Sequence, residues 1–268
     1  MSRHWAALMY HATPARHEDA DYFAVPALAL ARQLAWLRDR AIAGRSLEAV
    51  LGEGAESPGV AITFDDAQRS NFEVAFPLFA EAGMTATVFV VPAWVGRTGY
   101  CTWSQLRELQ AGGWSIQSHT QTHPFLSTLD EVAVMRELAD SRREIEDNLG
   151  APVMTLALPN GDWPQRRYRH LLEGSGYRYI ATSRWHANGD AERRRGVFGR
   201  YTVRRDTQPE AFDAMVTDLP GKLSRESLRL ATLSLVRSSL GVRRYGAIRR
   251  YLVDRRAATS AAGVTPQS

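Results

Sequence analysis

The chain has 268 residues, of which 44% are hydrophobic, so it can bury one sizeable core as a single α/β domain. Its 33 basic and 29 acidic residues give a net charge of +4, which is too small to indicate a nucleic-acid partner. The single cysteine, Cys101, excludes an intrachain disulfide and suits a reducing compartment. We find no secretory signal and no run of about 18 apolar residues, so we expect a cytoplasmic protein.

Short apolar runs alternate with longer amphipathic segments in the first part of the chain, and this alternation predicts strands and helices in turn. In chain order the predicted elements are a strand at 6–10, a helix at 25–40, a strand at 59–64, a helix at 72–82 and a strand at 85–91. Gly83 follows the second helix and is a typical stop signal.

The second part of the chain continues the same alternation. The predicted elements are a loop at 93–102, a helix capped by Ser104 and ending at Gly112, a strand at 114–117, a helix at 129–149, a strand at 153–158, a helix at 165–174, a strand at 179–182 and a last strand at 200–203. This order predicts parallel strands with helices outside, and about seven strands favour an incomplete barrel over an open sheet.

The C-terminal part differs in composition from the rest. Residues 223–256 are rich in arginine with leucines interleaved, so we divide the chain into a catalytic domain at 1–220, a basic helical appendage at 221–256 and a disordered tail at 257–268. The appendage either packs on the barrel with solvated arginines or makes peripheral contact with an anionic membrane. No recognised nucleic-acid module accompanies the charge.

Polar residues with chemical potential follow four predicted strands. His11 follows the first strand, Asp65 and Asp66 follow the second, His119 follows the strand at 114–117, and Asn160 follows the strand at 153–158. Sites in parallel α/β folds collect at the carboxyl ends of strands. We therefore expect these residues to meet at one edge of the sheet.

The spacing of His119 and His123 is compatible with a metal site. If this segment is helical, both imidazoles lie on one face and reach one ion, whereas the alternative is two unrelated surface or core histidines. Asp65 and Asp66 repel each other at a buried strand end unless a cation or hydrogen bonds compensate them; a helix cap needs only one of them. An Asp-His-His set leaves positions open for water and substrate, as hydrolysis requires.

The remaining chemistry needs a base and an acid. The carboxylate of the Asp65-Asp66 pair that does not bind the metal can act as the base on water. His11 is the best candidate for the acid, and the alternative is a histidine that bonds a loop. The other histidines have no such context and are interpreted as structural or solvated: His4, His17, His170 and His186.

Three motifs together resemble the polysaccharide deacetylases of carbohydrate esterase family 4. They are Thr-Phe-Asp-Asp at 63–66, His-Thr-Gln-Thr-His at 119–123 and Leu-Pro-Asn-Gly at 158–161. The resemblance covers residues 6–205. It implies a distorted (β/α) barrel and hydrolysis of N-acetyl groups with a divalent metal, zinc first and cobalt, nickel, iron or manganese as alternatives.

The resemblance also implies roles for single residues. Asp65 matches the catalytic base, and Asp66, His119 and His123 match the metal ligands. The backbone N–H of Asn160 matches a donor to the oxyanion that forms during acyl transfer.

The chain departs from the family pattern at two motifs. Ala67 stands where the family usually has glycine, and Ala157 stands where it usually has an arginine that pairs with the base. The family's later motifs are also missing, and no histidine follows His186. One alternative interpretation is therefore a non-catalytic relative that binds metal or glycan.

A circularly permuted branch of the family resembles this chain more closely. Deacetylases of exported poly-N-acetylglucosamine belong to that branch, and their acid histidine lies in an N-terminal Tyr-His, which Tyr10-His11 matches. We therefore hypothesise that His11 is the acid and that Arg200 replaces the arginine missing at Ala157.

The sequence thus predicts an enzyme that hydrolyses acetyl groups from N-acetylhexosamine units of a polysaccharide, an oligosaccharide or a lipid-linked glycan. An amidohydrolase acting on a non-sugar amide is the other alternative. Three aromatic residues in or beside the loop at 93–102 either stack on sugar rings or pack in the core: Trp94, Tyr100 and Trp103.

Overall fold

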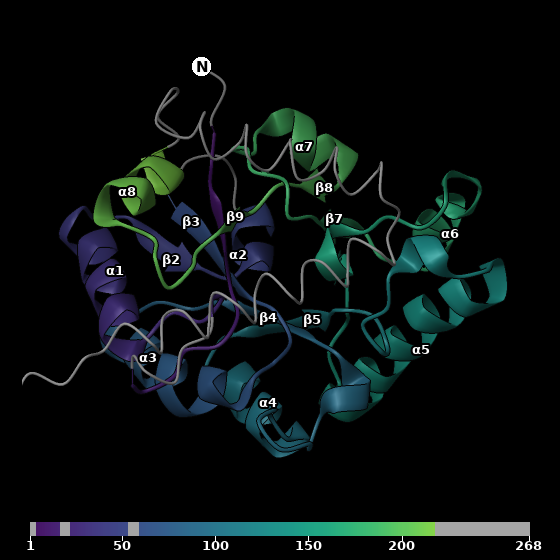
Figure 1. Cartoon of the computed structure of the whole chain (residues 1–268), viewed down its shortest axis with the longest axis horizontal. Coiled ribbons are helices and arrows are strands. Elements are labelled where there is room, and N and C mark those ends of the chain that lie inside the picture. Colours follow the sequence, from purple (N-terminus) through teal and green to yellow (C-terminus); the bar gives the residue numbers. More distant parts are fainter. Residues whose placement is uncertain (1–3, 17–21, 53–58, 218–268) are drawn as a thin grey trace, which may run out of the picture.

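The computed structural model describes residues 4–16, 22–52 and 59–217. Parallel strands lie at the centre of this part and helices lie around them (Figure 1). The basic appendage expected at 221–256 and the disordered tail expected at 257–268 are outside the described residues. Among the described helices, none is long and apolar enough to cross a membrane.

The described strands form one sheet in which every recorded pairing is parallel. Neighbours follow the order β8-β7-β6-β5-β4-β3-β1-β9, and β2 pairs with the start of β3. Their bounds are β1 Ala7–Tyr10, β2 Ala43–Arg45, β3 Gly59–Phe64, β4 Thr87–Val90, β5 Ser115–Ser118, β6 Thr155–Ala157, β7 Tyr179–Ala181, β8 Val197–Phe198 and β9 Tyr201–Thr202.

The sheet curls because one short segment pairs with both of its ends. β8 pairs with β7 and β9 pairs with β1, and only Gly199 and Arg200 separate β8 from β9. Backbone bonds continue both pairings: Thr182 donates its N–H to Phe198, and Val203 donates its N–H to Met9. The expected incomplete (β/α) barrel is therefore confirmed.

The α-helices pack around the strands of the barrel. Figure 1 shows α1, α3, α4, α5 and α6 around the outside of the strands. Their bounds are α1 Ala27–Asp39, α2 Leu47–Gly52, α3 Phe76–Ala82, α4 Trp103–Ala111, α5 Glu131–Leu149, α6 His170–Gly174, α7 Asp190–Arg195 and α8 Pro209–Thr217.

Three helix predictions need correction. The helix expected at 72–82 begins as a π-helical turn at Asn71–Ala75 before α3 starts. The helix expected at 165–174 is a 3-10 turn at Arg166–Tyr168 followed by the short helix α6. The cap of α4 is also not the expected Ser104.

Thr102 caps α4 instead of Ser104. The Thr102 hydroxyl accepts a hydrogen bond from the backbone N–H of Gln105, whose side chain accepts one from the backbone N–H of Thr102. This reciprocal capping box satisfies two backbone donors, whereas Ser104 lies inside the first turn. Thr102, two residues before Ser104, was therefore the stronger candidate for the N-cap of α4 in the sequence.

The barrel interior and the layer between sheet and helices form two separate cores. Side chains of successive strand residues point to opposite faces, so Ala7 lies in the interior cluster while Leu8 packs toward the helices. Leu47, Val50 and Leu51 of α2 belong to the interior cluster. The sequence analysis missed α2, because a helix of six residues is too short to show a periodic pattern.

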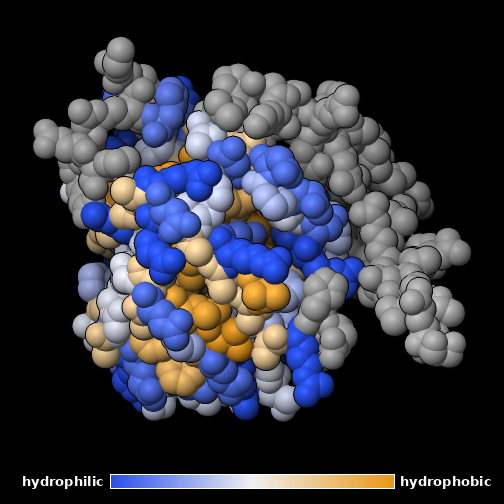
Figure 2. Space-filling model, turned by 90° about the vertical axis from the view of Figure 1, so that its left-hand side faces the viewer, coloured by the Kyte–Doolittle hydropathy of each residue, from blue (hydrophilic) through white to orange (hydrophobic). Residues whose placement is uncertain are grey.

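Figure 2 shows the face that lies on the left in Figure 1. A hydrophobic patch occupies the lower part of this face, and hydrophilic side chains surround it. Leu28 of α1 is the most exposed of the large hydrophobic residues in the described chain, at 65%. A single exposed apolar side chain such as Leu28 is ordinary on a protein surface.

The turn between β8 and β9 is held by Asn188. Its side-chain amide donates to the carbonyl of Gly199 at 2.9 Å and accepts from the N–H of Gly199 at 2.8 Å. Asn188 is fully buried and exchanges both backbone hydrogen bonds with Trp5. The turn that carries Arg200 is therefore fixed from the side of Gly199.

We expect Gly199→Ala to lower the free energy of unfolding by about 1–3 kcal/mol. A Cβ atom at this position would lie 2.4 Å from the His186 ring and 2.6 Å from the carbonyl oxygen of Arg184. The matched control is Gly174→Ala, where no atom lies within 4 Å, and there we expect a change within about 1 kcal/mol. Urea unfolding of both variants measures the difference. Equal stability would contradict the tight packing of this turn.

Candidate active site

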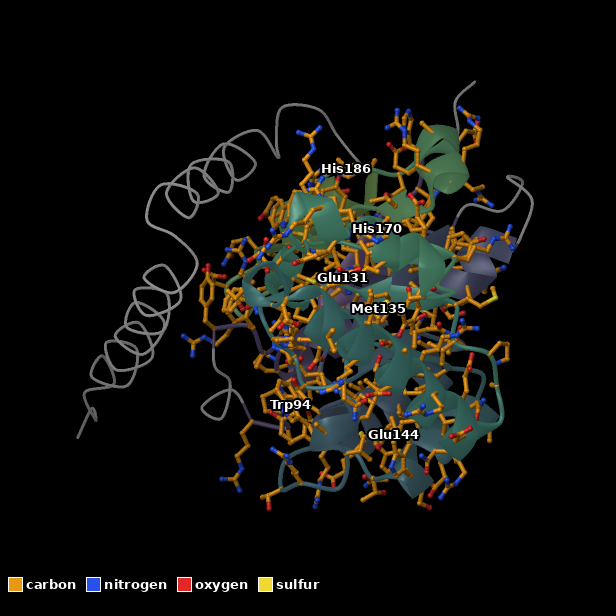
Figure 3. All side chains as sticks on the ribbon, turned by 90° about the vertical axis from the view of Figure 1, so that its right-hand side faces the viewer. Trp94, Glu131, Met135, Glu144, His170 and His186 are labelled. Atoms are coloured by element: carbon orange, nitrogen blue, oxygen red, sulfur yellow. The ribbon has the colours of Figure 1, made fainter. Side chains whose placement is uncertain are left out.

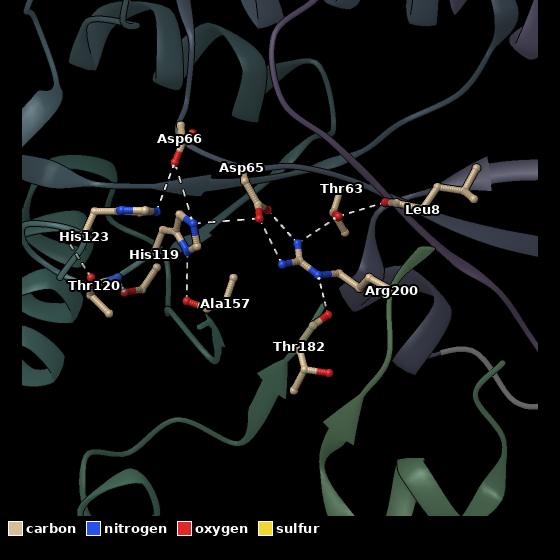
Figure 4. Close-up of polar contacts among 11 residues, drawn as sticks. Leu8, Thr63, Asp65, Asp66, His119, Thr120, His123, Ala157, Thr182 and Arg200 are labelled. Carbon is tan, nitrogen blue, oxygen red and sulfur yellow. Dashed lines mark hydrogen bonds and ion pairs between the residues drawn. The ribbon is translucent and has the colours of Figure 1, made fainter. Parts of the chain in front are cut away.

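The carboxyl ends of β1, β3 and β5 bring the predicted site residues together (Figure 4). Asp65 follows β3 directly, and its N–H donates to the carbonyl of Tyr10 at the end of β1. His119 follows β5, and its N–H donates to the carbonyl of Val90 at the end of β4. Neighbouring parallel strands therefore place these residues at one edge, as the sequence predicts.

Asp66, His119 and His123 form a cluster with the geometry of a metal site. Their potential ligand atoms all lie within 4.8 Å of one another, and both histidine Nε2 atoms are 3.7 Å from Asp66 Oδ1. That oxygen is buried and has no hydrogen-bond partner. A buried carboxylate oxygen without a partner is costly, so a divalent cation with mixed O and N ligands fits these three side chains.

A second contact orients the His119 ring. Its Nδ1 lies 2.8 Å from the carbonyl oxygen of Ala157 and donates to it, so Nε2 is the ring atom that faces Asp66. Ala157 stands at the position where the family usually has an arginine. Its carbonyl, rather than its side chain, acts on the site.

The segment between His119 and His123 is not helical, so the condition under which a helix would place both rings on one face does not hold. Thr120 has φ of 66° and His123 has φ of 62°, both in the left-handed region. Two such residues stop a regular helix, and the rings meet because the loop turns back on itself. The ring centroids lie 4.8 Å apart at 71°.

Strained backbone also occurs on the Asp66 side of the cluster. Asp66 has φ of 73° and Ala67 has φ of 52°. A left-handed conformation favours glycine, which explains why glycine suits the position of Ala67. Backbone strain of this kind is concentrated at functional sites.

Burial and charge set the ionisation of His123. Burial is the largest cause, and together with the charge of His119 it lowers the pKa of His123 to about 4, although Asp66 and Asp65 act in the opposite direction. His123 is therefore neutral at neutral pH. A neutral imidazole is the form that binds a metal.

Asp65 forms a buried, two-point ion pair with Arg200. Arg200 Nη1 donates to Asp65 Oδ1 at 2.6 Å and Arg200 Nη2 donates to Asp65 Oδ2 at 3.0 Å. The two residues are 3% and 1% exposed. The guanidinium also donates to the hydroxyl of Thr63 at 3.1 Å and to the carbonyl of Thr182 at 3.1 Å.

This ion pair sets the charge of Asp65. Burial is the largest single influence and raises the pKa of Asp65, but the combined effects of Arg200, His119 and His11 outweigh it and bring the pKa to about 2. Asp65 is consequently an anion throughout the neutral range. The sequence analysis quoted Thr63 only as part of a motif; its position two residues before Asp65 on the same strand face was the signal for its contact with Arg200.

His11 lies close enough to the cluster for its charge to affect Asp65 and His123. Its Nδ1 atom is buried and has no hydrogen-bond partner, while its backbone carbonyl accepts a hydrogen bond from Asn71 at 2.7 Å. The ring of Phe23 lies 5.4 Å from the His11 ring. His11 thus presents a ring atom that the protein leaves available for a proton.

Asn160 lies in the 3-10 turn Pro159–Gly161, directly after β6 and Leu158. Its φ of 55° and ψ of 17° are left-handed, and Gly161 follows with φ of 62°. The turn therefore belongs to the same edge of the sheet as the cluster. The role of its N–H as an oxyanion donor stays a prediction.

The aromatic residues of the loop at 93–102 divide into two groups. The ring of Trp94 lies 5.0 Å from the ring of His123, and the ring of Tyr100 lies 5.1 Å from that of Trp94. Burial, followed by the charge of Asp66, raises the pKa of Tyr100. Trp103 instead packs against the main core. Two of the three candidates therefore border the site.

These features define an incomplete parallel α/β barrel with a candidate metal site and a buried carboxylate–guanidinium pair at the carboxyl edge. The sequence model of one family, described as polysaccharide deacetylase, matches residues 52–180. Over that segment the chain is similar to polysaccharide deacetylases. The matched segment contains Asp65, Asp66, His119, His123 and Asn160; His11 and Arg200 lie outside it.

A curated relative and two solved structures are similar to this chain. This chain is 30% identical to the "Putative polysaccharide deacetylase YxkH" of Bacillus subtilis over 145 residues, which make up 54% of this chain. The chain spans about half the length of that relative, 50%.

The solved structures share the fold. The Streptococcus pyogenes deacetylase PplD, in complex with acetate, has a TM-score of 0.72 and 22% identity over 81% of this chain and 99% of that chain. The de-N-acetylase from Aggregatibacter actinomycetemcomitans has a TM-score of 0.68 and 18% identity over 80% of this chain and 100% of that chain.

We expect Arg200→Ala to cost about 3–5 kcal/mol at pH 7, because it leaves the Asp65 carboxylate buried without its partner. In the wild type the folded-state pKa of Asp65, about 2, lies below the ordinary 3.8, so its contribution is present above pH 3.8 and is lost as the pH falls through 2. In the variant burial raises the pKa of Asp65, so acid relieves the cost.

The stability difference between wild type and Arg200→Ala should therefore shrink from pH 7 to pH 4, as measured by urea unfolding. Adding Asp65→Ala to Arg200→Ala should recover part of the loss, since no buried charge then remains. A difference that stays constant with pH would contradict the coupling of these two residues.

Proposed function

We propose that the protein hydrolyses acetyl groups from N-acetylhexosamine units of a glycan, with a divalent metal held by Asp66, His119 and His123. The observation that carries this proposal is the position of the ion-paired Asp65 beside the cluster. Asp65 Oδ2 lies 3.8 Å from Nε2 of His119, a potential ligand atom. A carboxylate at that distance can reach a water molecule located between them.

Asp65 acts as the base in this proposal. With a pKa of about 2 it is fully ionised but weak, so it removes a proton readily only from an acidified water. A bound divalent metal supplies that acidification and polarises the substrate carbonyl; zinc is our first choice. Arg200 prevents rotation of the carboxylate because it holds both oxygens.

His11 acts as the acid that protonates the leaving nitrogen. Its location after β1, its unpartnered Nδ1 atom and its electrostatic effect on Asp65 support this role. The N–H of Asn160 acts as the donor to the oxyanion of the tetrahedral intermediate. We propose further that the chain belongs to the permuted branch, whose acid histidine lies in an N-terminal Tyr-His as in Tyr10-His11.

The similarity to polysaccharide deacetylases and the rings beside the site support the proposed substrate class. PplD was solved with acetate, and the Aggregatibacter protein is named a de-N-acetylase, which is said of those proteins. Trp94 and Tyr100 border His123, where an aromatic surface can stack on a sugar ring. These features favour a glycan over a small non-sugar amide.

We expect the purified protein to release acetate from short N-acetylglucosamine oligosaccharides, to lose this activity with a chelator and to regain it with zinc. Asp66→Ala removes one ligand and should abolish both zinc binding and turnover. A panel of small acetylated amides separates glycan hydrolysis from a general amidohydrolase. Zinc binding without acetate release from any acetylated substrate would indicate a non-catalytic relative.

We expect His11→Gln to lower kcat/KM by about 100- to 10,000-fold, because glutamine does not transfer a proton. Zinc affinity should stay within twofold of the wild type, since His11 is not one of the three ligands. The matched control is His170→Gln on the exposed helix α6, which should leave turnover unchanged. Full turnover of His11→Gln at all pH values would refute the assignment.

A further inference from the structure

The loop that carries both histidine ligands is fixed by one polar ridge of α5. We propose that Glu137 of this ridge is a positioning residue that holds His123 in the geometry required for the metal. This inference rests on the proposed metal site, and it concerns a residue that neither the motifs nor the chemistry assigned above include.

Glu137 contacts the loop three times. Its carboxylate accepts a hydrogen bond from the N–H of Thr122 at 2.8 Å and from the hydroxyl of Thr122 at 2.6 Å. Its backbone carbonyl accepts one from the N–H of Gln121 at 3.2 Å. Glu137 is thus bonded to the two residues that immediately precede the ligand His123.

Two other residues of α5 support the same loop. Glu144 accepts a hydrogen bond from the side chain of Gln121 at 2.8 Å, and Ser141 lies 2.8 Å from the hydroxyl of Ser118, which itself accepts from the N–H of Thr120. Residues 137, 141 and 144 are spaced i, i+4 and i+7, so they share one face of the helix. Figure 3 shows Glu131, Met135 and Glu144 in succession along α5.

The loop needs such support because its backbone is strained. Thr120 and His123 both have φ above 60°, a conformation that costs about 1–2 kcal/mol for each residue that is not glycine. Between them, Thr122 is fixed by charge-assisted bonds to Glu137, which are stronger than neutral ones. The other end of the turn is closed by the N–H of His123, which donates to the Thr120 hydroxyl at 3.2 Å.

Because of its position, we expect Glu137 to affect the geometry of the ligand His123 but to contribute little to the free energy of unfolding. Its bonds to Thr122 are at the exposed surface, where polar contacts contribute little to the free energy of unfolding. The same bonds decide where the His123 ring lies relative to Asp66. Loss of Glu137 should therefore affect metal affinity far more than folding.

The test is the zinc dissociation constant of the metal-free protein, measured by competition with a chromophoric chelator, together with its melting temperature. We expect Glu137→Ala to weaken zinc binding about 10- to 100-fold, as removal of outer-shell partners of metal ligands does. Glu137→Gln keeps one acceptor and should weaken it less. The matched control is Asp140→Asn on the same helix, where Asp140 pairs with Arg143, and there affinity should not change.

A second route uses the partner residue. Thr122→Val should weaken zinc binding alone, but should add little in the Glu137→Ala background, because the two residues share the contact. The proposal is overturned if Glu137→Ala binds zinc as the control does, or if its metal-free form melts so low that unfolding accounts for the weaker binding. It is also overturned if the wild type binds no zinc. Wild-type zinc binding without acetate release would refute only the proposed function.

Discussion

The buried pair of Asp65 and Arg200 is the interaction on which the site depends. A buried ion pair is tolerated only when its geometry is good and its remaining donors are satisfied. Arg200 meets this condition, because its guanidinium contacts both oxygens of Asp65, the hydroxyl of Thr63 and the carbonyl of Thr182. Thr63 and Asp65 lie on or directly after β3 and Thr182 follows β7, so Arg200 links strands that are four places apart in the sheet.

The pair determines how charge is distributed over the neighbouring residues. Asp65 and Asp66 are adjacent carboxylates, and their negative charges repel each other unless a positive charge is close. Arg200 compensates Asp65, which leaves Asp66 with the two histidines and an unpartnered oxygen. This division agrees with the proposed roles, in which Asp65 accepts a proton and Asp66 binds a cation.

Strand periodicity and motif spacing were enough to predict the main strands and the place where the site residues meet. The strand at 59–64 coincides with β3, and residues at strand ends met as expected because parallel strands end at a common edge. His119 and His123 meet without the helix that would have placed their rings on one face, since their spacing does not reveal that Thr120 is left-handed. The loop at 119–123 also bonds to α5, whose residues follow it in the sequence and are not part of the motif.

The short elements were missed for a similar reason. β2 and α2 have three and six residues, too few to show a period, and their places are decided by pairing with β3 and by the interior cluster. The contact between Arg200 and Asp65 joins residues 135 positions apart. It could be hypothesised only because the arginine expected at Ala157 was absent.

Ala157 and Arg200 lie close together in the barrel interior, next to Phe89. Ala157 is fully buried in the interior cluster together with Phe89, and the guanidinium of Arg200 lies 5.1 Å from the centre of the Phe89 ring. The small side chain on β6 leaves room in an interior that Arg200 enters from the turn between β8 and β9. These contacts support the hypothesis that Arg200 takes the place of the arginine missing at Ala157.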